Sequence, residues 1–413
     1  MKKPKVLAFV MAGGEGSRLS PLTLERSKPS VPFGARYRIV DFVLSNLVNS
    51  GIHSIYLLVQ YKSQSLIEHV RKAWVLPPML PEYFVTVVPP QMRFGQEWFQ
   101  GTADAIYQNI DLIRQHAPQM VLVFGADHIY RMDVQQMIDF HLENKAAATV
   151  AALPVPLKDA SAFGVIDADV EGRIRGFLEK PSQPPAMPDR PTHAYASMGN
   201  YLFNTEVLLE ALEKSRAEGG TDFGKHVLPD LMQGGKLFAY NFAKNSVPGV
   251  RPYEEKAYWR DVGTLDAYFE AHTDVLGLEP RFDVFNARWP MFSSSYQGPA
   301  ARFAKADLEN SMISAGCLID GAKIKNSVLR REVVVEPGVE IEDCIIMDYS
   351  IIKRGAKLKR VIVDRYNVIG ENERIGYDLE QDRKRYHVTE SGIVVLAKGE
   401  RYGSLRGSFE GED

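Results

Sequence analysis

The feature that most constrains the fold of this chain is an apolar repeat of six residues beyond residue 310. The repeat is carried by branched apolar residues, namely Val333, Val339, Ile345 and Ile351, then Ile346, Ile352 and Leu358, and finally Ile362 and Val368. A period of six matches neither a helix nor an ordinary strand, but it is typical of a parallel β-helix, in which each short face contributes one apolar residue. The alternative is a run of short strands in a sandwich. Because the six-residue spacing of the apolar residues is kept over several successive repeats, we predict a parallel β-helix.

The first two thirds of the chain alternate two other patterns. Short apolar runs predict buried strands at 6–11, 54–60, 120–125 and 147–152. Amphipathic spacing between these runs predicts helices at 41–50, 63–72, 103–115 and 133–145. This order predicts an α/β domain with a mostly parallel sheet, whose ligands bind beyond the carboxyl ends of the strands. We expect a catalytic domain at 1–270, a connecting segment at 271–300 and the β-helix at 301–413.

Charge and cysteine content exclude several classes of protein. Lys and Arg number 49 and Asp and Glu number 52, so the net charge is −3 and provides no overall field for nucleic acid or an anionic membrane. The two cysteines, Cys317 and Cys344, lack the paired spacing of a zinc site and favour a reducing compartment. The apolar run at 6–12 is far shorter than the ~18 residues that a membrane span requires, and it leads into a glycine-rich turn rather than a cleavage site. We expect a cytoplasmic protein.

A glycine-rich turn follows the first predicted strand and contains Gly13, Gly14 and Gly16. The backbone N–H groups of such a turn can approach a phosphate closely. The turn lacks the Gly-Lys-Ser/Thr of a P-loop, and a leucine replaces the third glycine of the dinucleotide fingerprint. Arg18 and Lys28 add two cations nearby, a combination that suits a triphosphate.

Two aspartates are candidate ligands of a divalent cation. Asp127 follows the strand predicted at 120–125, and Asp261 lies in a Trp-Arg-Asp-Val-Gly-Thr tract far along the chain. Each aspartate alone is more often a cap or turn residue, but together with a phosphate-binding turn they predict Mg²⁺ bridging phosphates. His128 has no second histidine at metal-ligand spacing, so the sequence does not predict it as a ligand.

One further motif has two interpretations, and another is set aside. Glu179 and Lys180 end a predicted strand and form either a surface ion pair or a clamp on substrate. Asp222-Phe223-Gly224 imitates the metal-binding triplet of kinases, but the other kinase motifs are missing from the sequence.

The chain as a whole resembles the bacterial glucose-1-phosphate adenylyltransferase, or ADP-glucose pyrophosphorylase, family. The resemblance is carried by tracts spread over nearly the whole sequence, at 11–19, 27–29, 37–42, 101–105, 125–128, 161–165, 179–181, 197–199 and 258–264. The Gly-Gly-x-Gly-x-Arg-Leu element is common to sugar nucleotidyltransferases. The tracts at 37–42 and 258–264 are more specific to the ADP-glucose branch.

The resemblance implies a Rossmann-like nucleotidyltransferase domain, a left-handed parallel β-helix with regulatory and oligomerising roles, and a homotetramer. The implied reaction converts ATP and α-D-glucose 1-phosphate into ADP-glucose and pyrophosphate for glycogen synthesis, with Mg²⁺ as cofactor and without nucleic acid or membrane partners. It assigns catalysis to Arg18, Lys28 and Asp127, and the metal to Asp127 and Asp261. It assigns the nucleotide to Gly13, Gly14, Gly16, Gln60 and Gly101, and the sugar phosphate to Phe99, Gly164, Glu179, Lys180, Ser197 and Tyr201.

Two departures from the family pattern affect these expectations. Phe99 stands where the family usually has tyrosine, which removes a hydroxyl group. The family binds sugar-phosphate or nucleotide effectors in a basic cluster, here implied to be Arg26, Arg38 and Arg365, but Glu25 replaces the lysine that grips the activator in the enteric type. Because Glu25 repels a phosphate, we expect fructose 1,6-bisphosphate to activate weakly at best.

Three alternatives follow from the same motifs. A related transferase would use UTP, dTTP or GTP with the same phosphate machinery. A catalytically silent regulatory subunit would have lost Arg18, Lys28, Asp127 or Lys180, all of which are present. A β-helix acyltransferase usually brings a longer coil and a catalytic histidine, whereas His387 is the only histidine beyond residue 272.

Overall fold

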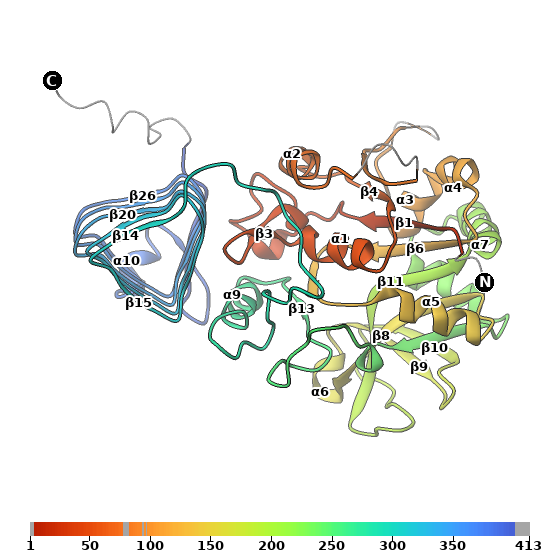
Figure 1. The fold of residues 1–413 in the computed structure, drawn as a ribbon. Helices are drawn as coiled ribbons and strands as arrows, with labels where there is room; N and C mark the ends of the chain where they lie inside the picture. The colour runs from red at the N-terminus through yellow and green to blue at the C-terminus, as the bar shows by residue number, and fades with distance from the viewer. Residues whose placement is uncertain (1–3, 77–81, 93–94, 96, 401–413) are drawn as a thin grey trace.

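The structure, a computed structural model, describes residues 4–76, 82–92, 95 and 97–400. Figure 1 shows an α/β domain built on a central sheet and, beside it, a three-sided β-helix formed by the C-terminal part of the chain. Within the described ranges, no helix combines the length and the apolar character needed to cross a bilayer.

The central sheet has the strand order β10-β9-β11-β6-β1-β4-β5, with β8 and β12 joined to it through β11. Its strands are β1 (Val6–Met11), β4 (Ser54–Leu58), β5 (Phe84–Val88), β6 (Met120–Gly125), β8 (Ala148–Pro156), β9 (Gly164–Ala168), β10 (Ile174–Glu179), β11 (His193–Asn204) and β12 (Leu237–Asn241). Neighbours β5, β4, β1 and β6 are parallel, whereas β11 runs antiparallel to β6, β8 and β9. The structure thus confirms the predicted α/β class and the four predicted strands.

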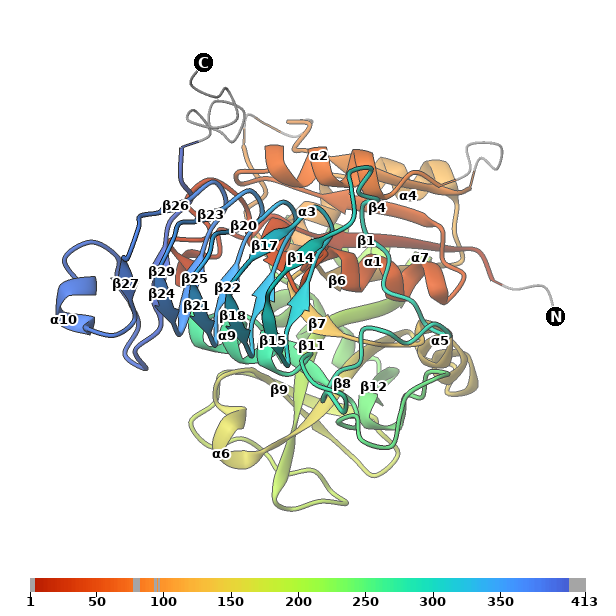
Figure 2. The same ribbon diagram turned by 60° about the vertical axis from the view of Figure 1, so that its left-hand side comes forward.

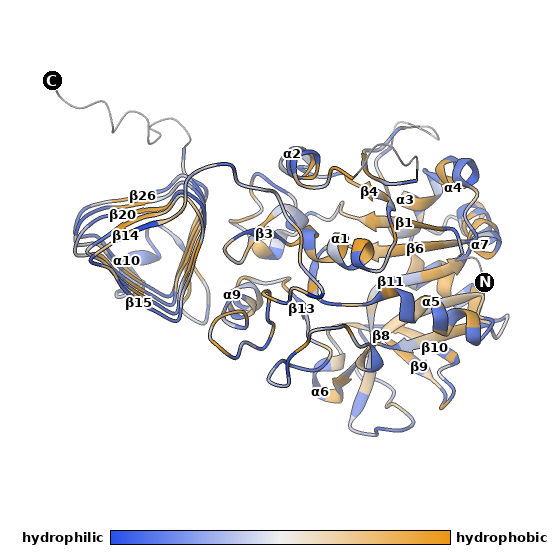
Figure 3. Cartoon of the chain, viewed as in Figure 1, coloured by the Kyte–Doolittle hydropathy of each residue, from blue (hydrophilic) through white to orange (hydrophobic). Residues whose placement is uncertain are grey.

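Apolar strands explain why this sheet lies at the centre of the domain. The hydropathy colouring of Figure 3 shows the central strands as apolar and much of the outer helical surface as polar. Both faces of the sheet pack into apolar cores, one containing Phe9 and Val123 and the other Val10 and Leu122. Successive residues of a strand point to opposite faces, so a continuous apolar run is what a doubly covered strand requires.

The helices cover the two faces of the sheet, and one prediction among them is wrong. The helices are α1 (Val40–Asn49), α2 (Gln64–Ala73), α3 (Thr102–Tyr107), α4 (Ile110–His116), α5 (Val134–Glu143), α6 (Leu157–Ala160), α7 (Thr205–Ala217), α8 (Leu228–Met232) and α9 (Leu265–Thr273). The helix predicted at 103–115 is interrupted between α3 and α4. Asn109 leaves the helical conformation there, caps α4 and donates its side-chain amide to the Ala105 carbonyl at 2.8 Å.

The C-terminal part confirms the predicted β-helix. Its three faces are parallel sheets with the strand orders β14-β17-β20-β23-β26, β15-β18-β21-β24-β27 and β16-β19-β22-β25-β29-β28, in which only β28 is antiparallel (Figure 2). The strands are β14 (Arg302–Ala304), β15 (Asp307–Glu309), β16 (Met312–Ile313), β17 (Leu318–Asp320), β18 (Lys323–Lys325), β19 (Val328–Leu329), β20 (Val334–Val335), β21 (Glu340–Glu342), β22 (Ile345–Ile346), β23 (Ile351–Ile352), β24 (Lys357–Lys359), β25 (Val361–Val363), β26 (Val368–Ile369), β27 (Arg374–Ile375), β28 (His387–Val388) and β29 (Val394–Leu396). A short helix, α10 (Leu379–Asp382), lies beyond the last full coil (Figure 2).

The structure shows coils that are shorter than three steps of six. Paired residues are 16 residues apart in the first coils (302 to 318 to 334) and 17 apart in the later ones (334 to 351 to 368). In the later coils one series of buried positions advances by six, five and six residues and contains Val335, Ile341, Ile346, Ile352, Leu358, Val363, Ile369 and Ile375. Val368, predicted as part of the apolar repeat, is 53% exposed because it falls one residue out of this phase.

The α/β domain and the β-helix share a buried interface rich in arginine. Arg330 lies on the β-helix and donates to the backbone carbonyl oxygens of Phe33, Gly34 and Tyr37 at 2.7 to 3.2 Å. Arg26 of the α/β domain forms a fully buried ion pair with Asp364 of the β-helix. Buried charges are retained when they are paired, so these contacts hold the two parts in one arrangement.

Candidate functional site

The predicted binding residues lie where parallel strands β1, β4 and β6 end. The glycine-rich turn follows β1, Gln60 follows β4, and Asp127 follows β6 by two residues. In sheets of this kind the carboxyl ends of neighbouring strands meet in a crevice, so residues distant in sequence become neighbours.

A cavity of about 480 Å³, here called the turn cavity, brings together the residues predicted to bind nucleotide. Its lining includes all of them, with both predicted catalytic cations and one aspartate: Gly13, Gly14, Gly16, Gln60, Gly101, Arg18, Lys28 and Asp127. Gly16 has φ +66°, and a Cβ there would lie 2.7 Å from the Cβ of Lys28. Glycine is therefore required for the turn to pass so close to the lysine.

Three charged groups meet at the inner end of the turn cavity. Lys28 Nζ lies 2.9 Å from Asp127 Oδ2 and 2.8 Å from Asp261 Oδ1, although the two aspartates are far apart in sequence. Burial lowers the pKa of Lys28, but Asp127 and Asp261 outweigh it and the net pKa is raised. Burial likewise raises the pKa of Asp127, but His128 and Lys28 outweigh it and hold that carboxyl well below its usual pKa range. Lys28 and Asp127 are thus ionised together at neutral pH.

A second cavity of about 380 Å³, here called the Ser197 cavity, lies on the other side of these aspartates. Gly164, Glu179, Ser197 and Tyr201 line it, together with Asp127 and Asp261. Asp127 therefore faces both cavities, and a group bound in one can reach a group bound in the other at the two carboxylates.

Lys180 lies at the rim, in a third hollow of about 660 Å³ that also includes Arg18, Gly164, Glu179 and Asp261. Its Nζ is 3.7 Å from Glu179 Oε1, and both side chains are largely exposed. This loose ion pair contributes little to stability and leaves the ammonium group available to a ligand.

Phe99 lies in the turn cavity and not with the residues of the Ser197 cavity. Its backbone N–H donates to Gln60 Oε1 at 2.6 Å, and Gln60 Nε2 donates to its carbonyl at 3.3 Å. The segment therefore fixes the Gln60 amide through main-chain bonds, which a phenylalanine makes as well as a tyrosine.

Sequence reasoning did not assign several residues that line the Ser197 cavity, among them Asp222, Lys225, Trp259 and His128. Asp222 accepts a hydrogen bond from the Thr102 hydroxyl at 3.0 Å, which ties its loop to the start of α3. The Asp-Phe-Gly motif marks this loop in the sequence, but a comparison with kinase motifs alone assigns it no role. His128 lies with Asp127 and Asp261 in a group whose ligand atoms are all within 4.8 Å of one another, although its sequence spacing did not predict a metal ligand.

The three arginines predicted as regulatory come together away from these cavities, at the interface with the β-helix. Burial, with the positive charges of Arg365 and Arg26, lowers the pKa of Arg38 to about 9. Arg26 Nη1 and Arg365 Nε are buried and have no hydrogen-bond partner among the described residues. Glu25 pairs with Lys398, and this pair together with the charges of Arg26 and Arg365 lowers the pKa of the Glu25 carboxyl against the opposing effect of burial.

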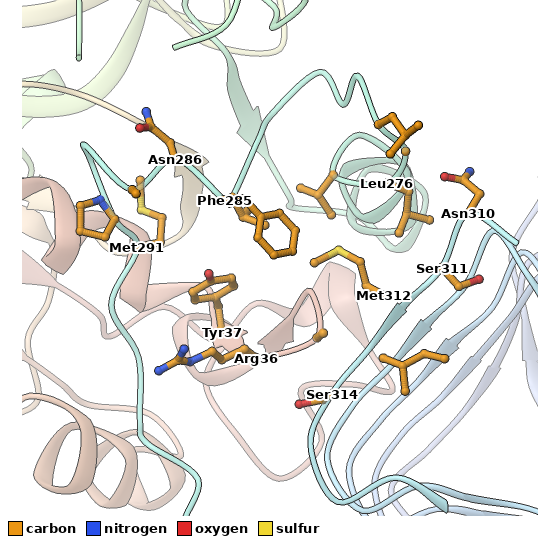
Figure 4. A pocket seen from close by; sticks show the side chains of 18 residues that line it. Arg36, Tyr37, Leu276, Phe285, Asn286, Met291, Asn310, Ser311, Met312 and Ser314 are labelled. Carbon is orange, nitrogen blue, oxygen red and sulfur yellow. The ribbon is translucent and has the colours of Figure 1, made fainter. Parts of the chain in front are cut away.

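A cavity of about 920 Å³ also lies between the α/β domain and the first coil of the β-helix (Figure 4). Tyr37, Leu276, Phe285 and Met312 extend toward it from separate segments. Its lining is mostly apolar and includes none of the residues predicted to bind substrate.

Comparison with known proteins agrees with this geometry. Residues 7–277 match the family model of nucleotidyl transferases, and residues 299–396 match the GlmU-like C-terminal hexapeptide model. The chain is 59% identical to the glucose-1-phosphate adenylyltransferase of Thermodesulfovibrio yellowstonii, with 97% of each chain covered. It is 47% identical to the enzyme of the same name from an Anaeromyxobacter species, covering 96% of this chain and 99% of the relative, and 44% identical to that of Corynebacterium jeikeium, covering 96% and 98%. The chain is therefore a nucleotidyltransferase that belongs to the glucose-1-phosphate adenylyltransferase family.

Proposed function

We propose that this chain transfers the adenylyl group of ATP to α-D-glucose 1-phosphate, giving ADP-glucose and pyrophosphate for the synthesis of glycogen. The observation that carries this proposal is the position of Asp127, which lines both the turn cavity and the Ser197 cavity, with Asp261 beside it in the second. The triphosphate would occupy the first cavity and the sugar the second, so the α-phosphorus and the attacking phosphate would meet at the carboxylates. The names of the relatives support this choice of substrates.

The chemistry needs positioning and charge neutralisation more than proton transfer. An anionic oxygen of the sugar phosphate attacks the α-phosphorus in line, and the bond from that phosphorus to the oxygen bridging to the β-phosphate breaks. Because the nucleophile is already ionised, no strong base is required. The backbone of Gly13 and Gly14 would hold the phosphates, while Arg18 and Lys28 would neutralise the charge that develops on departing pyrophosphate.

Asp127 and Asp261 would hold the Mg²⁺ ion. Their carboxylates already enclose one cation, the Lys28 ammonium group, and carboxylate oxygens are the ligands that Mg²⁺ prefers. When bound, the ion would neutralise phosphate charge and orient the α-phosphate. On the sugar side, Glu179, Ser197 and Tyr201 would face the hydroxyl groups, and Lys180 would bind the sugar phosphate.

A panel of nucleotides tests the substrate assignment. Pyrophosphate release is measured with ATP, UTP, dTTP and GTP, each with glucose 1-phosphate and with other sugar 1-phosphates. The proposal expects ATP with glucose 1-phosphate to be the preferred pair. A clear preference for UTP or dTTP would replace it with another nucleotidyltransferase activity.

The arginine cluster supports allosteric control by an anionic metabolite. Three mutually repelling cations, two of which have a buried nitrogen atom without a partner among the described residues, gain free energy when a sugar phosphate or nucleotide binds among them. The test measures the rate over a range of effectors for the wild type and Arg365→Gln. Effector response should be lost in the variant while the basal rate is kept, and strong activation by micromolar fructose 1,6-bisphosphate would contradict the expected role of Glu25.

A homotetramer and the domain division are part of the same proposal. Leu278 is 97% and Phe285 is 79% exposed near the cavity of Figure 4, and covering such side chains favours contact with a second copy of the chain. Sedimentation should give a tetramer for the wild type and a smaller species for Leu278→Glu.

The domain division at 1–270, 271–300 and 301–413 is supported by the two family matches. A cytoplasmic location is supported by the buried free thiols of Cys317 and Cys344.

A further inference from the structure

We propose that Nδ1 of His128 is a third protein ligand of the divalent cation, beside Asp127 and Asp261. This inference rests on the proposed metal site and adds a nitrogen atom to its ligands. It concerns a residue whose sequence spacing gave no reason to expect metal binding.

The first observation is the environment of the ring nitrogen. His128 Nδ1 is buried and has no hydrogen-bond partner among the described residues, while the side chain as a whole is 14% exposed. A buried polar atom without a partner is unfavourable, so such an atom in a binding site calls for an explanation. A cation bound at Nδ1 supplies the missing partner.

The second observation is the position of that nitrogen relative to the carboxylates. Nδ1 lies 3.4 Å from Asp127 Oδ1, and ligand atoms of His128, Asp127 and Asp261 all lie within 4.8 Å of one another. Ligands that bind one ion at about 2.1 Å lie about 3 to 4 Å apart, so a small approach of the three groups would place them around a common ion. Lys28 contacts the opposite oxygen of Asp127, Oδ2, which leaves Oδ1 facing the histidine.

The third observation is that the backbone fixes this arrangement. His128 begins β7 (His128–Tyr130), which pairs antiparallel with β13 (Trp259–Asp261), and His128 is directly opposite Asp261. The imidazole ring also packs against the Trp259 indole, with 4.6 Å between ring centroids. A paired strand and a tilted contact with the indole hold Nδ1 toward the carboxylates before any ion binds.

A nitrogen ligand changes which ions the site prefers. Oxygen ligands alone suit Mg²⁺, whereas imidazole suits transition metals such as Co²⁺. His128→Gln replaces the nitrogen with an amide oxygen, so it should lower the affinity for Co²⁺ more than the affinity for Mg²⁺. A purely structural role for His128 predicts no such change in the ratio of the two affinities.

The direct test is pulsed electron paramagnetic resonance on the full chain with ¹⁵N-labelled histidine. Mn²⁺ and pyrophosphate are used as probes because pyrophosphate contains no nitrogen. The expected result is a hyperfine coupling from a directly bound ¹⁵N imidazole, lost in His128→Gln and kept in His387→Gln, a control at an exposed histidine of the β-helix. Mn²⁺ affinity should fall about 10- to 100-fold in His128→Gln, the range typical of weakened metal sites.

The outcomes separate this inference from the proposed function. Mn²⁺ binding that is lost in Asp127→Asn, with no ¹⁵N coupling in the wild type, overturns the role of His128 and leaves the aspartate site intact. Mn²⁺ binding that survives Asp127→Asn overturns the metal site itself. Because the wild-type spectrum alone decides whether imidazole binds, the test does not depend on the folding of any variant.

Discussion

The ammonium group of Lys28 lies 2.9 Å from Asp127 Oδ2, with only 8% of the lysine side chain exposed. The same group also contacts Asp261, so one ammonium group is shared by both carboxylates and offsets part of their negative charge. A divalent cation approaching these aspartates therefore meets a positive charge already in place. The lysine favours metal that arrives together with phosphate, whose negative charge offsets the repulsion.

Lys28→Met should bind metal more tightly and react more slowly. With the competing charge removed, Mn²⁺ affinity of the nucleotide-free protein should rise about tenfold or more, measured by titration calorimetry. Turnover should fall at least ~100-fold, because a main electrostatic group is lost from the transition state. Lys62→Met is the control, since the Lys62 ammonium lies 3.4 Å from the Thr23 carbonyl rather than beside the aspartates. Unchanged Mn²⁺ affinity in Lys28→Met would show that the two cations do not compete.

Gly101→Ala should weaken ATP binding and destabilise the fold. An added Cβ would lie 2.4 Å from the Thr221 carbonyl oxygen, which accepts the first N–H groups of α3 from Ala103 and Asp104. Either the 221–224 loop or the start of α3 must move, at a cost of about 1 to 3 kcal/mol. Denaturant unfolding and the KM for ATP measure the two effects. In Gly14→Ala the added Cβ meets no atom within 4 Å, so its unfolding free energy should stay that of the wild type.

Asp364→Asn should loosen the attachment of the β-helix to the α/β domain. Asp364 is fully buried and neutralises Arg26, which is 2% exposed. Removing one charge of a buried pair leaves the other uncompensated and costs about 3 to 5 kcal/mol. The free energy of unfolding, measured at a fixed protein concentration, reports this loss. Glu309→Gln, which breaks an exposed pair with Lys325, should cost less than ~1 kcal/mol, and equal losses in the two variants would contradict the account.

Protonation of His272 should destabilise the protein as pH falls. Its Nε2 accepts the Gly34 N–H at 3.0 Å and its Nδ1 donates to the Tyr268 carbonyl at 2.9 Å, so the ring is neutral. Burial lowers the pKa of His272 to about 3, whereas an unfolded histidine titrates near 6.5. The unfolded state therefore binds the extra proton first, and the stability present above pH 6.5 is lost as pH falls toward 3.

The pH effect is isolated by comparison with a variant. Between pH 6 and 4 the unfolding free energy of the wild type should fall by about 1.4 kcal/mol per pH unit more than that of His272→Gln. His387→Gln, at an exposed position, should follow the wild type. Parallel pH profiles for the wild type and His272→Gln would contradict a neutral buried ring.

The sequence predicted those features of the fold that depend on neighbouring residues better than those that depend on residues far apart in the chain. The apolar runs of β1 and β6 predicted their bounds to the residue, because a doubly covered strand must be apolar throughout. The β-helix was predicted as a class, but its coils of 16 and 17 residues were not, since the coil length is set by which strands pair on successive coils.

The site was predicted unevenly for the same reason. The glycine-rich turn can be recognised from consecutive residues. The contact between Lys28 and Asp261, by contrast, depends on strands that pair although they are far apart in the sequence. His128 faces Asp261 only through the register of β7 and β13, which no local spacing encodes. Asp222 and Thr102 are likewise far apart in the sequence, so local spacing could not predict that Asp222 lies in the site.

The central claim is that the chain makes ADP-glucose at the carboxylate of Asp127. The most direct test compares pyrophosphate release from ATP and glucose 1-phosphate by the wild type and by Asp127→Asn, with circular dichroism to verify folding. The account predicts turnover by the wild type and a folded variant that is at least ~100-fold slower. Near-normal turnover in Asp127→Asn would contradict the account.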